Sequence, residues 1–223
     1  MSRKGSFLTG KFFAHGRFFW LLISLVLSLI VSTFLHQHII FQWTSTLLLF
    51  FILIAAILTV KESSRFMIFL IIVAALSILF NISNLIAPGV FNQFSAKLFL
   101  AFFCVLLIGC FGKDILKLKE VTVDLFFGAI CVYLLIAITF GLLYHMINIL
   151  DPQSFYMLSS GVRVSPTEFD FFYFSFTTLT TVGYGDVAIV TAHAKALVVV
   201  ESISGIFYLA ILVSRLVARH GKN

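Results

Sequence analysis

Charged residues are scarce in this chain of 223 residues, in which Asp, Glu, Lys and Arg together make up 11%. A typical soluble domain carries about 25% charged residues. So few charges cannot cover the surface of a water-soluble fold of this length. Apolar residues account for 61% of the chain and occur in long runs. The composition therefore predicts an integral membrane protein.

Cysteines and other reactive side chains are also few. Cys104, Cys110 and Cys131 all lie inside apolar runs, so we expect packed small side chains and neither disulfides nor a metal site. His36 and His38 have no third ligand nearby. The sequence shows no nucleophile–base pair, metal cluster or phosphate-binding loop, so we predict that the protein is not an enzyme and has no cofactor.

Long apolar runs fill most of the chain. Crossing a bilayer core of about 30 Å takes about 20 helical residues, and six runs are long enough. A seventh run is too short to cross, so we expect a re-entrant helix there. The six predicted spans cover roughly residues 18–36, 43–60, 66–86, 95–112, 122–147 and 193–217, and the short run covers roughly 169–180.

Basic residues set the predicted orientation. With the N-terminus inside, twelve Lys and Arg lie in inner segments, and only Lys97, Arg163 and Lys195 lie outside. The positive-inside rule then predicts a multi-pass protein of the cell membrane with both termini cytoplasmic. The net charge of +6 is explained by this topology, so we predict no nucleic-acid partner.

The predicted re-entrant helix has a recognisable start. Ser165-Pro166-Thr167-Glu168 fits a capping box with Ser165 at the N-cap and Glu168 at the third helical position. A helix from there to Thr180 would cross about half of the membrane. Its C-terminal end would carry partial negative charge and favour a cation near the membrane centre.

The sequence TTVGYGD follows directly at residues 180–186, and TVGYG is the sequence of potassium-channel selectivity filters. Successive backbone carbonyls can face one axis only if some residues adopt positive φ, which glycine does without steric cost. The predicted K+ ligands are Thr181, Val182, Gly183, Tyr184 and Gly185. We expect the Thr181 hydroxyl to close the innermost site and the Val182 and Tyr184 side chains to brace the strand.

Residues from about 122 to 219 resemble the pore domain of the potassium channel superfamily, with an outer helix, pore helix, filter and inner helix. The inner helix most resembles those of small prokaryotic channels. The resemblance implies a homotetramer in membrane lipid, Gly205 as an inner-helix hinge, and a hydrogen bond from Tyr173 to the filter aspartate Asp186. Close helix packing at Gly205 and aromatic packing at Tyr173 are the alternatives.

The implied fold class is an all-α membrane protein with six transmembrane helices plus a re-entrant pore helix and selectivity-filter loop. The polar stretch KDILKLKE at residues 113–120 predicts a boundary between a four-helix membrane module, residues 1–120, and a pore domain, residues 121–223. The fourth predicted span has no Lys or Arg between Leu98 and Gly112, unlike a voltage sensor. We therefore expect the first module to be a structural or lipid-facing collar.

Glu201 is the one acidic residue deep inside a predicted span. An intramembrane carboxylate is costly and suggests function. Glu201 lies one turn before Gly205, and its possible partners are the hydroxyls of Thr177, Thr178 and Thr180. A structural role and a gating role are both open.

The predicted function is a potassium-selective channel subunit that conducts K+ passively through a tetrameric central pore without strong voltage gating. One alternative is a potassium uptake transporter subunit, which would carry four degenerate loops in one longer chain. Another is a poorly selective cation channel, which would have an altered filter.

Overall fold

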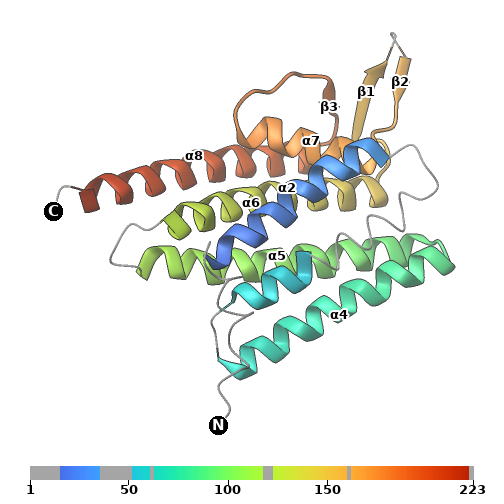
Figure 1. The fold of residues 1–223 in the computed structure, drawn as a ribbon. Coiled ribbons are helices and arrows are strands. Elements are labelled where there is room, and N and C mark those ends of the chain that lie inside the picture. The colour runs from blue at the N-terminus through green and yellow to red at the C-terminus, as the bar shows by residue number, and fades with distance from the viewer. Residues whose placement is uncertain (1–15, 36–51, 61–62, 118–122, 160–161, 221–223) are drawn as a thin grey trace.

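Long helices lying side by side dominate the structure, a computed structural model that describes residues 16–35, 52–60, 63–117, 123–159 and 162–220 (Figure 1). A further helical segment covers residues 52–59. The long helices are α2 (Arg17–Leu35), α4 (Ser64–Ile86), α5 (Val90–Lys117), α6 (Val123–Leu150) and α8 (Ala192–His220).

Four described helices are long and apolar enough to cross a membrane, within Ser64–Ile86, Val90–Ile115, Phe126–Leu150 and Ala192–Arg215. The protein is therefore a multi-pass membrane protein. The first predicted span contains a shorter apolar helix, Phe18–Val31. Of the predicted span 43–60 the structure describes residues 52–60, and 52–59 are helical. The count of six stays a prediction. The predicted span 95–112 is too short, because α5 has 28 residues.

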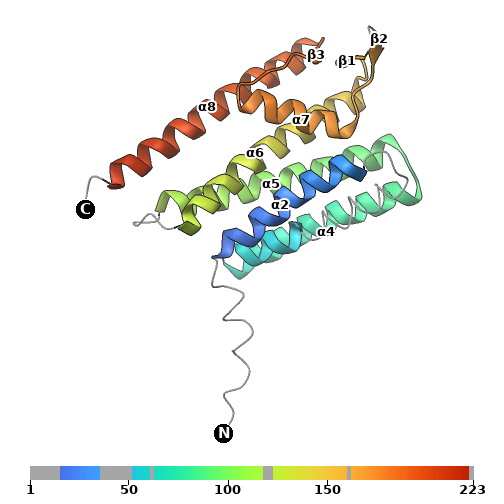
Figure 2. The same cartoon turned by 45° about the horizontal axis from the view of Figure 1, so that its top comes forward.

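The helices are layered, with α8 at one edge, α4 at the opposite edge, and α6 and α5 between them (Figure 2). One apolar core joins the N-terminal helices to the first half of α6. In it, the Phe18 and Phe111 rings pack edge to face, with centroids 5.0 Å apart, and Leu135 of α6 is buried in the same cluster. The core therefore continues across the predicted boundary near residue 120. The three cysteines are buried in this core as packed side chains, which was the packing predicted for them.

The start of α2 is also fixed by the C-terminal half of the chain. The Phe18 backbone N–H donates to Asp124 Oδ1 of α6 at 3.0 Å. A carboxylate at this position accepts from one of the first N–H groups of the helix, which have no acceptor within the helix itself, and complements the positive end of the helix dipole. Gly16 has φ 85°, and a Cβ there would lie 2.3 Å from Asp124 Oδ1.

The fold is mainly helical, as predicted, and a small three-stranded antiparallel sheet that was not predicted is added to it. Its strands are β1 (Phe155–Ser159), β2 (Val162–Val164) and β3 (Val187–Ile189), in the order β2-β1-β3. Aromatic and β-branched residues favour extended backbone in these segments. Because β1 pairs with β3, the sheet joins the segment before the short helix α7 to the segment after the TVGYG loop.

Candidate functional site

The short helix α7 (Glu168–Leu179) has 12 residues and lies between α6 and α8. Two glycines allow this close packing. A Cβ on Gly141 of α6 would lie 2.6 Å from the Phe172 ring, and a Cβ on Gly205 of α8 would lie 2.7 Å from the Leu179 carbonyl oxygen. Gly141 was not predicted, because nothing in its sequence neighbourhood marks it. Its importance depends on which face of α6 meets α7.

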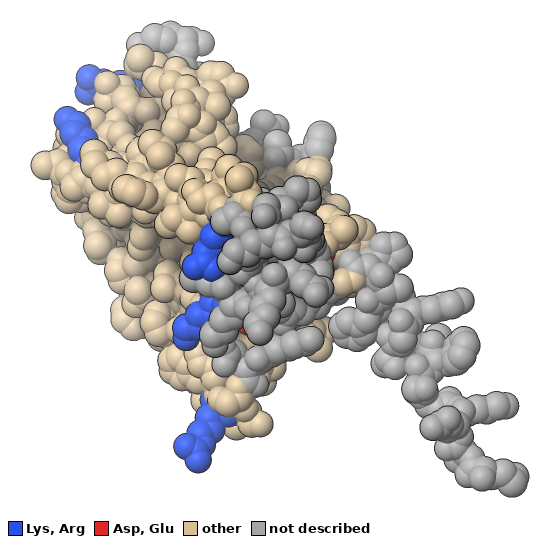
Figure 3. Space-filling model, turned by 90° about the vertical axis from the view of Figure 1, so that its left-hand side faces the viewer, with Lys and Arg blue, Asp and Glu red and all other residues tan. Residues whose placement is uncertain are grey.

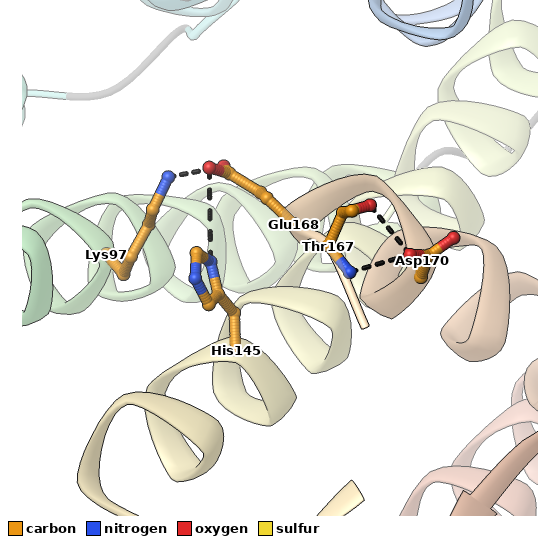
Figure 4. Close-up of polar contacts among 5 residues, drawn as sticks. All are labelled: Lys97, His145, Thr167, Glu168 and Asp170. Atoms are coloured by element: carbon orange, nitrogen blue, oxygen red, sulfur yellow. Dashed lines mark hydrogen bonds and ion pairs between the residues drawn. The ribbon is translucent and has the colours of Figure 1, made fainter. Parts of the chain in front are cut away.

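The first residue of α7 differs from the prediction. The N-cap is Thr167, and its capping partner is Asp170 (Figure 4). The Thr167 N–H and hydroxyl both donate to Asp170 Oδ2, at 2.6 and 2.7 Å. The predicted pair of Ser165 and Glu168 is wrong. The pattern T-x-x-D overlaps S-x-x-E in the sequence, and the first is used because Glu168 is engaged elsewhere.

Glu168 forms an ion pair with Lys97 of α5, whose ammonium group hydrogen-bonds to Oε1 (Figure 4). His145 of α6 also lies near the Glu168 carboxylate, with its Nδ1 4.0 Å from Oε2. The His145 ring stacks on Phe171. Burial by itself would raise the pKa of the Glu168 carboxyl, but Lys97 and then His145 hold it below its ordinary value. Glu168 is therefore ionised at neutral pH and links α5 directly to the start of α7.

The TVGYG loop begins at the C-terminal end of α7. Gly183 and Gly185 have φ values of 53° and 77°, the conformation that the sequence analysis predicted for both. Thr181 also has positive φ, 60°, which was not predicted and is strained for a β-branched residue. The N–H groups of Val182 and Gly183 both donate to the carbonyl oxygen of Thr177, at 2.9 and 3.1 Å, so the first part of the loop is held against the helix end.

The structure places Tyr173, Tyr184 and Asp186 together. The two tyrosine rings are stacked, with centroids 6.2 Å apart and an angle of 7° between them. Partial burial, followed by the hydrogen-bonding interaction with the Asp186 carboxylate, raises the pKa of Tyr173 to about 12. The Tyr173 hydroxyl therefore keeps its proton at neutral pH and can serve as a donor. Whether this contact supports a filter stays a prediction.

The C-terminal end of α7 is held from both sides. The Tyr133 hydroxyl of α6 donates to the Leu179 carbonyl oxygen at 3.0 Å, and Gly205 of α8 packs closely against the same residue. Helix α8 is continuous through Gly205. The structure therefore shows close packing at Gly205, and the predicted hinge stays a prediction.

Glu201 of α8 is fully buried, with 0% exposure. Its carboxyl group hydrogen-bonds to the hydroxyls of Tyr144 on α6 and Ser175 on α7. One carboxyl group therefore connects all three helices around the candidate site.

The predicted partners of Glu201 are wrong. The Thr177 hydroxyl donates to the Phe174 carbonyl at 3.0 Å, and the Thr180 hydroxyl donates to the Phe176 carbonyl at 2.6 Å. These hydroxyls are used within their own helix, as is common for threonine. For Thr178 the structure shows no contact with Glu201 either. Tyr144 had no role in the sequence analysis, since only the packing of α6 against α8 brings it to Glu201.

Comparison with known protein families gives a match over residues 129–220, to the family model described as ion channel. A search of curated proteins finds no match to the chain. The matched segment includes most of α6, all of α7, the TVGYG loop and α8, which are the elements that build the candidate site. The similarity supports an ion-channel function for this membrane protein.

Proposed function

We propose that the protein is a subunit of a potassium-selective channel. The observation that carries the proposal is the TVGYG loop, in which both glycines have positive φ, at the end of a helix too short to cross the membrane. Helices α6 and α8 are each long enough to cross it. This arrangement lets backbone carbonyls replace the hydration shell of a K+ ion. Potassium is then the transported ion, and the proposed mechanism needs no cofactor.

A homotetramer is part of the proposal, because one loop cannot surround an ion. Val182 and Tyr184 are 54% and 71% exposed in the single chain. Helix α8 also has many exposed apolar residues, which four copies around one axis would partly cover. They include Val199, Val200, Ile203, Ile206, Phe207 and Val213.

Charge supports an orientation with both termini in the cytoplasm. Figure 3 views the end of the molecule at which α5 and α8 finish and α6 begins, and Lys and Arg side chains are spread over this end while acidic ones are nearly absent from the view. The basic residues described near this end are Arg65 at the start of α4, Lys113 near the end of α5 and Arg215 near the end of α8. The opposite end carries Glu168, Asp170 and Asp186, which would attract cations to an outer mouth.

Selectivity is tested by recording from purified protein in a planar bilayer, with K+ on one side and Na+ on the other. We expect a reversal potential close to that of a K+-selective conductance. A reversal potential near zero in the wild type would overturn the proposal.

Two alanine substitutions make a matched pair for this test. A Cβ on Gly183 or on Gly109 of α5 would meet nothing within 4 Å, but only Gly183 has positive φ. We therefore expect Gly183→Ala to abolish or degrade selectivity, because a Cβ opposes this conformation. Gly109→Ala should leave the reversal potential unchanged. Equal effects of the two substitutions would contradict a specific role for the loop.

Assembly is tested separately by native mass spectrometry of the active protein in detergent. We expect four copies of the chain. An active species that is strictly monomeric or dimeric would overturn the tetramer and leave the reversal-potential result to be explained by another arrangement of loops.

A further inference from the structure

The buried cluster around Glu201 contains more oxygen contacts than its two hydroxyl groups can supply with protons. Ser175 Oγ lies 2.7 Å from the Ala137 carbonyl oxygen of α6 and also hydrogen-bonds to Glu201 Oε1. The Tyr144 hydroxyl hydrogen-bonds to Glu201 Oε2. The cluster therefore has three oxygen–oxygen contacts, each of which needs one proton.

The protons can be counted from the chemistry of each group. Ser175 and Tyr144 each have one O–H proton, and the Ala137 carbonyl can only accept. If Tyr144 donates to Glu201 and Ser175 donates to Ala137, the contact between Ser175 and Glu201 has no hydroxyl proton left. An ionised carboxylate would then face the lone pairs of Ser175 in a buried site. The missing proton can come only from the carboxyl group of Glu201.

The surroundings of Glu201 agree with a neutral group. In the described part of the chain, the titratable side chains that interact with it are Tyr133 and Tyr144, both on α6. Neither is a cation, and the contacts that act on the carboxyl group are the hydroxyls of Ser175 and Tyr144. A buried carboxylate without a positively charged partner is costly.

We propose that Glu201 is a protonated carboxylic acid in the folded channel. Its O–H donates to Ser175 Oγ, the Ser175 O–H donates to the Ala137 carbonyl, and the Tyr144 O–H donates to Glu201 Oε2. This chain of donors runs from α8 through α7 to α6. Glu201 is thus a positioning residue that fixes the helix behind the loop without placing a negative charge there. Removal of its proton would leave Ser175 facing two acceptors and would break one contact. The proposal does not depend on which ion is conducted.

Infrared spectroscopy of the protein in liposomes at neutral pH tests the proposal. The chain has four glutamates, Glu62, Glu120, Glu168 and Glu201, so labelling glutamate carboxyl carbons with 13C restricts the labelled bands to four groups. The difference between the spectra of labelled wild type and labelled Glu201→Gln isolates the Glu201 signal. We expect a carboxylic-acid C=O band that shifts on exchange into D2O. A pair of carboxylate bands in that difference would overturn the proposal.

Glu168→Gln provides the matched control, because Lys97 holds the Glu168 carboxyl ionised. The same difference spectrum should show carboxylate bands for Glu168. If Glu201→Gln does not fold, Ser175→Ala in the labelled protein gives a second test that leaves Glu201 in place. We expect the acid C=O band to shift, because its acceptor is lost. A shift confined to carboxylate bands would reject the protonated form.

Discussion

Two different glutamates hold the two halves of α7. Glu168 holds the first turn, and Glu201 of α8 holds the deeper half, which is the C-terminal half that contains Ser175. At the first turn, Glu168 pairs with Lys97, and its side chain is 36% exposed. In the deeper half, the hydrogen-bond partners of Glu201 within the described part of the chain are two hydroxyl groups, and the residue is fully buried. Near water an ion pair costs little to form, whereas a charge in a low-dielectric interior requires a partner that this site does not offer.

The two halves of α7 also have partners from different parts of the chain. Lys97 belongs to α5, in the N-terminal half of the chain, so the first turn of α7 is linked to that half. The deeper contacts come from α6 and α8, the helices on either side of the TVGYG loop. The contacts of the deeper half should therefore set the stability of the channel, and those of the first turn should have a smaller effect that depends on pH.

The largest effect is expected from Glu201→Ala. The substitution removes the acceptor of the Tyr144 hydroxyl and opens a cavity in a buried site, so we expect a loss of about 2–4 kcal/mol of stability per subunit. Glu201→Gln keeps a donor for Ser175 and an acceptor for Tyr144 and should cost less than about 1 kcal/mol. Thermal denaturation in detergent measures both. Equal losses for the two variants would show that these hydrogen bonds contribute little.

Gly205→Ala should have the second largest effect. The new Cβ would lie 2.7 Å from the Leu179 carbonyl oxygen, which is backbone and cannot rotate away. Overpacking of this kind costs about 1–3 kcal/mol and should also shift the helix end that leads into the loop. We expect lower thermal stability and altered single-channel conductance.

Gly109→Ala is the control for Gly205→Ala, because a Cβ on Gly109 meets nothing within 4 Å. Replacing a helical glycine by alanine without a clash should stabilise the protein by up to about 1 kcal/mol. The two substitutions are therefore expected to change thermal stability in opposite directions. A stabilising Gly205→Ala would contradict close packing of α8 against α7.

Glu168→Gln should have a smaller effect, which depends on pH. The folded-state pKa of Glu168 lies below its ordinary value of 4.5, so the stabilisation is present above that value and is lost as the pH falls through the folded-state pKa. Because Glu168 is about one-third exposed, we expect at most about 1 kcal/mol at neutral pH. The free energies of unfolding of wild type and variant, measured by denaturation across acidic pH, should converge as the pH falls. A difference that persists in acid would contradict the ion pair.

Lys97→Met tests the same pair from the other side. It leaves Glu168 without its cation, so its cost at neutral pH should exceed that of Glu168→Gln. The double variant should recover part of the loss, and a double-mutant cycle gives the coupling between the two residues. Additive effects would show that Lys97 and Glu168 do not interact.

Local sequence patterns predicted part of the site. The positive φ values of Gly183 and Gly185 follow from a loop whose backbone conformation is set by the glycines themselves. The short length of α7 follows from Pro166 at its start and from the glycines after it. These features depend on neighbours in sequence, so they can be predicted before the packing is known.

The predictions that were wrong concern contacts between residues far apart in the sequence. For Glu201, the choice among the hydroxyls of α7 depends on how α8 is rotated against α7, and Tyr144 comes from a third helix. For the start of α7, two overlapping capping patterns were available, and the ion pair of Glu168 with Lys97 decided between them. The antiparallel sheet was missed because its strands are short and because β1 pairs with β3, which follows only after α7 and the TVGYG loop.

The smallest expected effect is that of membrane voltage on opening. Moving one elementary charge through the membrane potential is worth about 2.3 kcal/mol per 100 mV. Helix α5 has no charged residue between Lys97 and Lys113, and Lys97 is already held at the first turn of α7 by Glu168. Helix α5 could therefore move only a fraction of a charge. Recordings in symmetric K+ over a wide voltage range should give a shallow curve of open probability, and one steeper than about four charges per channel would reveal a sensor outside α5. Lys97→Met should leave this curve unchanged, because the ion pair fixes Lys97 in place and does not carry it across the field.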